Sequence, residues 1–175
     1  MIRNRGHAQQ MELPFLPWTG EYAIGHAALD AEHRRLVEVI NEVCAFENTG
    51  CAPEQLKPLL EALTVATVAH FKNENTVMRE ISGWASRLDA EHRAAVDMMS
   101  AAAVNEHCAE HAKALLELES IIHAFYFGAD SDRETLGKTL IDWFLEHALE
   151  QDLDLRDLLK VYFSQSQAAA ARNGP

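Results

Sequence analysis

The stretch "LEALTVATVAHFKNENTVMREI", residues 60–81, decides the fold. Its apolar residues recur every three or four positions, which is the period of an α-helix with one face turned to a core. His70 and Glu74 lie on that same face, one helical turn apart. The stretch therefore predicts a long helix that carries a histidine and a glutamate into the interior of the protein.

Three other stretches have the same helical period. They run from Leu29 to Val43, from His107 to Phe125 and from Leu136 to His147. Residues 47–53 and 127–132 interrupt them with glycine, proline, asparagine and aspartate, which end helices and form turns. Four long helices joined by short turns predict an all-α fold, an antiparallel up-down four-helix bundle.

The length of 175 residues corresponds to a single domain with a sizeable core. We divide the chain into an N-terminal arm (1–17), the bundle (18–165) and a flexible C-terminal tail (166–175). Residues 82–104, between the second and third helices, are too many for a turn and have a helix-forming composition. They predict an extra helical insertion.

Composition excludes several classes of protein. The net charge of −12 argues against a surface for nucleic acid or anionic membranes, because both require clustered lysine and arginine. No apolar run approaches the length of about 18 residues that a membrane helix needs, and the N-terminus lacks the apolar segment of a signal peptide. The three cysteines form no CxxC motif, so no disulfide framework is expected. These features favour a cytoplasmic protein with reduced thiols.

Seven polar residues lie on the predicted inward faces of the four helices. They are His33, His70, Glu74, His107, His111, His147 and Asp152. Equal lengths of chain separate His111 and His147 from the turn between them, so the constant rise of a helix returns both to one level. Asp152 follows His147 by five residues and can reach the same point if the fourth helix ends or distorts there.

One inward histidine is usually a core residue with a hydrogen-bond partner. Seven buried polar groups at one level are costly unless something satisfies them together. A metal does so, and imidazole suits iron, zinc, copper or nickel. Seven donors are too many for one tetrahedral zinc ion, but they fit two six-coordinate ions that share the two carboxylates.

These motifs resemble those of the hemerythrins, in particular the bacterial hemerythrin-like proteins. That family carries H on helix one, HxxxE on helix two, HxxxH on helix three and HxxxxD on helix four. Here the motifs are His33 in "LDAEHRRL", "HFKNE" (70–74), "HCAEH" (107–111) and "HALEQD" (147–152). All seven positions are filled, in order.

The resemblance implies a cofactor of two iron ions. The three histidines of the third and fourth helices would hold one ion, and His33 and His70 would hold the other. Glu74 and Asp152 would bridge the ions together with an oxo or hydroxo group. The ion held by two histidines would keep an open position for O2.

The resemblance also assigns residues around the centre. Phe144 stands three residues before His147, where the family commonly has a leucine that lines the O2 pocket, and Trp143 lies beside it. Asp30 is either an outer partner of a ligand or an acid at a helix N-terminus. His92, in the insertion, has no histidine four residues later, so we assign it as a non-ligand.

The function implied is reversible O2 binding by a non-haem di-iron protein, for carriage, storage or delivery, rather than enzymatic turnover. No ExxH motif occurs at the inward positions, unlike in ferritin-like di-iron oxidases. Three alternatives stay open: a sensor of O2, NO or redox state, a di-iron peroxidase or NO-handling enzyme, and a bundle with a structural metal or none. Residues 82–104 offer a surface for a protein partner.

Overall fold

The structure is a computed structural model, and it describes residues 15–47, 49, 52–87, 101–129 and 135–172. No strand occurs in these ranges, and none of their helices is long and apolar enough to cross a membrane. The helices are η1 (Gly20–Tyr22), α1 (Ala27–Glu47), α2 (Pro53–Ala85), α4 (Ala101–Phe127), α6 (Leu136–Glu146), η3 (His147–Gln151) and α7 (Leu153–Arg172). The predicted all-α fold is confirmed.

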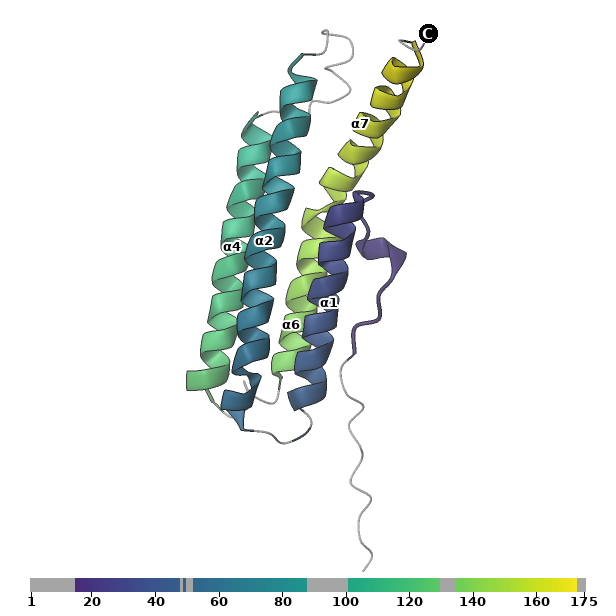
Figure 1. Ribbon diagram of the computed structural model, residues 1–175. Helices are drawn as coiled ribbons and strands as arrows, with labels where there is room; N and C mark the ends of the chain where they lie inside the picture. The colour runs from purple at the N-terminus through teal and green to yellow at the C-terminus, as the bar shows by residue number, and fades with distance from the viewer. Residues whose placement is uncertain (1–14, 48, 50–51, 88–100, 130–134, 173–175) are drawn as a thin grey trace, which may run out of the picture.

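The long helices form an antiparallel bundle in which each helix packs on two neighbours. Helix α1 contacts α2 and α6, and α4 contacts the same two helices from the other side. Figure 1 shows α2 beside α4 and α1 beside α6, while α7 continues the column of α6 and leans away at its upper end. The fourth helix of the predicted bundle is therefore built from α6, η3 and α7 in succession.

Local sequence explains where these helices begin and end. Helix α2 begins at Pro53, which needs no hydrogen-bond partner for its nitrogen, and the Ala52 N–H donates to the side-chain oxygen of Gln55 (3.0 Å). Helix α4 ends at Phe127, directly before Gly128. Helix α7 continues to Arg172, through residues that composition assigned to a tail, because its run of alanines has the highest helix propensity.

The predicted boundaries of the arm and of the insertion differ from those in the structure. Leu16 is assigned to the arm, yet its N–H and carbonyl both pair with the side chain of Asn41 on α1, at 2.8 Å each. The ends of the predicted insertion belong to α2 and α4. Its middle, 88–100 with His92, lies outside the described residues.

Two apolar clusters fill the bundle, one on each side of a polar layer. The first lies toward the turn between α1 and α2, and includes Leu36, Leu63, Leu118 and Leu140. The second includes Leu29, Met78, Val104 and Leu155. On α1, for example, His33 lies between Leu29 of one cluster and Leu36 of the other. The inward polar residues thus lie in the middle of the bundle, with apolar packing above and below.

Candidate metal centre

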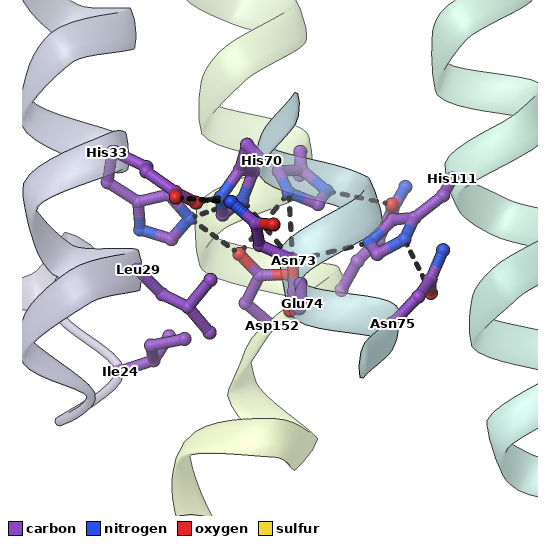
Figure 2. Close-up of polar contacts among 12 residues, drawn as sticks. Ile24, Leu29, His33, His70, Asn73, Glu74, Asn75, His111 and Asp152 are labelled. Atoms are coloured by element: carbon purple, nitrogen blue, oxygen red, sulfur yellow. Dashed lines mark hydrogen bonds and ion pairs between the residues drawn. The ribbon is translucent and has the colours of Figure 1, made fainter. Parts of the chain in front are cut away.

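All seven residues that the sequence predicts as ligands lie in this polar layer, and Figure 2 labels five of them: His33, His70, Glu74, His111 and Asp152. Six of them are at most 2% exposed, and the side chain of His107 is 10% exposed. They come from α1, α2, α4, η3 and the residue that follows η3. The structure therefore brings residues more than a hundred positions apart in the chain to one buried point.

Glu74 is the centre of the layer. Its Oε2 lies 3.2 Å from His70 Nε2 and 3.4 Å from His111 Nε2. Its Oε1 lies 3.4 Å from His107 Nε2. One carboxylate thus faces histidines from both α2 and α4.

Asp152 is the second carboxylate of the layer, and it contacts histidines of α1 and η3. Its Oδ2 lies 3.1 Å from His33 Nε2 and 3.3 Å from His147 Nε2. Two groups of four side chains each offer ligand atoms that lie within 4.8 Å of one another: His33, His70, His147 and Asp152, and Glu74, His111, His147 and Asp152. Asp152 and His147 belong to both groups, and His107 joins the layer through Glu74.

The outer ring nitrogens show how the histidines are oriented. Nδ1 of His33 donates to the Tyr22 carbonyl at 2.7 Å, and Nδ1 of His111 lies 3.0 Å from the amide oxygen of Asn75. Since each outer nitrogen faces an oxygen acceptor, each must carry the proton in a neutral ring. The Nε2 lone pairs are then left to face the centre, as metal ligation requires.

Several buried atoms of the layer make no hydrogen bond to the part of the chain that the structure describes. Both oxygens of Glu74 and Asp152, and Nε2 of His111 and His147, are buried without a hydrogen bond among the described residues. Nε2 of His33 lies 3.0 Å from Nε2 of His70, so the two ring nitrogens face each other across the layer. Buried acceptors in such an arrangement need cations or protons between them, so the donor set fits metal ions.

A comparison with known families identifies the domain. Residues 25–159 match the model described as the hemerythrin HHE cation-binding domain. The chain belongs to the hemerythrin family. The relationship inferred from the four motifs is thereby confirmed.

Curated relatives agree with this membership. The chain is similar to a protein named bacteriohemerythrin from Campylobacter jejuni subsp. jejuni serotype O:23/36 (strain 81-176), with 25% identity over 71% of this chain and 80% of that protein. Proteins of the same name from serotypes O:6 (strain 81116 / NCTC 11828) and O:2 (strain ATCC 700819 / NCTC 11168) are 24% identical over the same shares. No solved structure is similar enough to the chain to count as a match.

The spacing of the last hemerythrin motif has a structural cause. Residues His147–Gln151 form a π-helix, and the Asp152 N–H donates to the His147 carbonyl at 3.2 Å, five residues back. An α-helix would join residues four apart. The wider turn brings the Asp152 carboxylate to 3.3 Å from His147 Nε2, through the kind of helix distortion that the sequence spacing called for.

Electrostatics in this hemerythrin layer keep negative charge at its centre. Burial alone would raise the pKa of Glu74, but the imidazoles of His107, His111 and His70 outweigh it and hold that pKa well below its usual value. Burial lowers the pKa of His147, although Asp152 opposes it. A carboxylate that stays ionised among imidazole rings is suited to bind cations.

His70 differs from the other rings. Burial lowers its pKa, but the carboxylates of Glu32 and Glu74 outweigh burial and raise it to about 9. Glu32 lies 3.1 Å from His70 Nδ1, and its own pKa is lowered because the hydrogen bonds from His70 and Asn73 outweigh partial burial. In the metal-free protein, this ring therefore holds a proton that a metal ion would replace.

Sequence reasoning missed the residues that hold the outer ring nitrogens. Glu32 contacts His70, Asn75 contacts His111, and the amide oxygen of Gln151 lies 3.1 Å from His147 Nδ1. Each is adjacent in sequence to a predicted ligand, namely His33, Glu74 and Asp152. That adjacency was the available signal, since a residue next to an inward position lies at the border with a neighbouring helix.

Asp30 contacts the loop before α1 rather than a ring. Its Oδ1 accepts from the N–H groups of Ile24 (2.7 Å) and Gly25 (3.3 Å). Gly25 has a φ of 88°, a backbone conformation that residues with a side chain rarely adopt. The loop carries the Tyr22 carbonyl that accepts from His33, so Asp30 supports a ligand through the backbone, and its role toward the metal stays a prediction.

The two residues assigned to the O2 pocket differ in their contacts. The Phe144 ring is fully buried and lies edge to face with His33, at 6.0 Å between ring centroids. The indole N–H of Trp143 donates to the Ala114 carbonyl at 3.0 Å, and Trp143 lines a groove between α4 and α6. Phe144 therefore contacts the predicted ligand His33, and the assignment of both residues to the O2 pocket stays a prediction.

Proposed function

We propose that this layer holds two iron ions and that the protein binds O2 reversibly at one of them, as a carrier, store or delivery protein. The observation that carries the proposal is that two overlapping groups of four ligand atoms lie in the layer and share the Asp152 carboxylate and His147. Glu74 adds a second carboxylate that contacts histidines from both α2 and α4. Two carboxylates between two sets of imidazoles suit a pair of ions better than one.

The histidines would divide unequally between the ions. His107, His111 and His147 would hold one, and His33 and His70 the other. The second ion would then have one imidazole fewer, which leaves room for a small external ligand. A bound diferrous pair would supply the two electrons that O2 accepts on binding.

The surroundings of the layer suit binding without turnover. Phe144 and Tyr22 pack beside His33, with 5.6 Å between the centroids of the two aromatic rings. Both residues are at most 6% exposed, so they shield the two-histidine side from water. Within the described residues, the carboxyl and imidazole groups of the layer would all serve as ligands, so no separate acid or base is assigned. Relatives named bacteriohemerythrin support the same function.

The test is anaerobic reconstitution with ferrous iron, followed by an iron count and repeated exposure to O2. We expect about two irons per chain and an absorption spectrum that changes with O2 and reverts on degassing. Binding of fewer than two irons would contradict the di-iron centre. A single irreversible change to a stable diferric form would contradict reversible carriage and favour a redox sensor or an enzyme. Glu74→Ala is the control, since it removes the shared carboxylate and should abolish the spectral change.

A further inference from the structure

The predicted ligand rings do not have equivalent outer partners. Nδ1 of His33 faces a backbone carbonyl, and Nδ1 of His111 and His147 faces the amide oxygens of Asn75 and Gln151. Nδ1 of His70 faces the carboxylate of Glu32. Among these four rings, only His70 has a charged partner.

Glu32 is held in place from two sides. It extends from α1 to α2, where its Oε2 lies 3.1 Å from His70 Nδ1 and its Oε1 accepts from the Asn73 amide at 2.7 Å. Figure 2 shows Asn73 beside His70 and Glu74. The Glu32 side chain is 29% exposed, so the protein shields much of its charge from water. The carboxylate is therefore a fixed negative charge on the outer edge of a ligand ring.

Orientation alone does not require this charge. Neutral acceptors already hold the outer nitrogens of His33, His111 and His147 at 2.7, 3.0 and 3.1 Å. A carboxylate adds a second effect, because it draws the Nδ1 proton and makes Nε2 a stronger electron donor to a metal. His70 belongs to the pair of histidines that would hold the ion with fewer imidazoles.

We propose that Glu32 is a positioning residue that strengthens the two-histidine iron position through His70. The inference rests on the proposed function, since it concerns the ion that would carry the open position. The charge compensates that ion for its missing third imidazole and raises its affinity for iron. It also favours the ferric state there, because a stronger donor lowers the reduction potential.

Two matched variants test the role of the charge. Glu32→Gln keeps an oxygen for His70 Nδ1 and removes the charge, while the Asn73 amide can rotate to accept from the new amide group. Gln151→Glu places a carboxylate at the outer nitrogen of His147, which belongs to the other ion. Both substitutions conserve side-chain length. The first variant removes a negative charge beside His70, and the second adds one beside His147.

The first measurement is ferrous iron binding by equilibrium dialysis without oxygen, with separate constants for the two ions. We expect Glu32→Gln to weaken one constant by about 10- to 100-fold and to leave the other unchanged. Gln151→Glu should not weaken that constant. The midpoint potential of the weakened position should rise in Glu32→Gln, which loss of packing would not cause.

The outcomes separate this inference from the proposed function. If the unmodified protein binds fewer than two irons, the di-iron function fails. If it binds two and Glu32→Gln changes neither constant nor the potential, Glu32 has no such role and the di-iron function stands. If both variants weaken the same constant, the assignment of Glu32 to the two-histidine position is wrong. Thermal melting of the metal-free variants shows whether a loss of folding contributes.

Discussion

Asp152 donates its N–H to the carbonyl of His147 at 3.2 Å, and its carboxylate lies 3.3 Å from the Nε2 of that same histidine. The five-residue π turn between them makes both contacts possible. It also sets the rotation of α7, whose Leu155 and Leu159 pack in the second apolar cluster. The position of the predicted ligand Asp152 and the packing of α7 therefore both depend on one extra residue in the fourth helix.

Deletion of Glu150, which is exposed in this turn, should convert it to an α-helical turn. The residues after it would rotate by about 100°, so Leu155 and Leu159 would leave the core and Asp152 would change its position relative to His33. We expect a lower melting temperature and fewer than two irons per chain. Glu150→Ala keeps the length and should change the free energy of unfolding by no more than about 0.5 kcal/mol. A deletion variant that melts like the parent and binds two irons would refute the role of the π turn.

Phe144→Leu should speed the release of O2. The ring of Phe144 is fully buried and lies against His33, so a smaller side chain opens space beside the two-histidine position. We expect a cost of about 1 kcal/mol in stability and a several-fold faster release in stopped-flow measurements. Phe125→Leu makes the same change in the first apolar cluster, about 21 Å along α4 from the predicted ligand His111, and should leave the rate unaltered. Equal release rates for Phe144→Leu and the parent would remove Phe144 from the O2 pocket.

Ionisation of Glu47 should lower the free energy of unfolding as the pH rises. Burial raises the pKa of its carboxyl group, although hydrogen bonds from the Gly137 and Leu136 N–H groups oppose it. The folded state therefore holds the proton more tightly than the unfolded state. The stabilising contribution is complete below the usual pKa of 4.5 and is lost as the pH passes the raised value.

Glu47→Gln keeps an acceptor for Gly137 without a charge. We expect a higher melting temperature than the parent at pH 7, and a smaller difference at pH 4, where the parent carboxyl is protonated. Melting curves at both values, on proteins with the same metal content, measure the effect. A difference that is independent of pH would show that ionisation of Glu47 is not its cause.

Gly137 allows α6 to approach α1 closely. A Cβ atom at this position would lie 2.7 Å from Glu47 Oε2 and 2.8 Å from Cys44 Sγ. Gly137→Ala should therefore destabilise the protein by about 1–3 kcal/mol in denaturant unfolding. Cys44→Ala in the same chain should recover part of the loss, since it removes one of the two clashing atoms.

Gly83→Ala is the control for this substitution, because an added Cβ there meets nothing within 4 Å. Near the end of α2 it should leave stability unchanged or raise it by up to about 1 kcal/mol, through helix propensity. If Gly137→Ala and Gly83→Ala have the same free energy of unfolding, close packing is not the reason that position 137 requires a glycine.

Much of the fold could be predicted because helix faces are a local property. Whether His70 and Glu74 share a face depends only on the helical period, and the turn residues after Phe127 and before Pro53 are visible in the chain. Composition misjudged the extent of α7, whose alanines were assigned to a tail. High helix propensity outweighed the expectation that a chain end frays.

The outer partners of the rings could not be predicted in this way. Glu32 reaches His70 only because α1 and α2 pack at a particular rotation, and Asn75 reaches His111 only across the contact of α2 with α4. Neither contact involves residues that are close in sequence. These contacts depend on how the helices pack against each other, which the periodic pattern of a single helix does not show.

By itself, the sequence determined four amphipathic helices, the seven side chains on their inward faces and the common level of those side chains, because period and rise are set by backbone hydrogen bonding. Only the tertiary structure decided the rest. It placed Asp152 beneath His147 through a π turn, set the Nδ1 proton on each of the rings that face an acceptor, and gave His70 a charged partner in Glu32. These features depend on atoms from neighbouring helices at distances of about 3 Å, where a small rotation of one helix removes the contact.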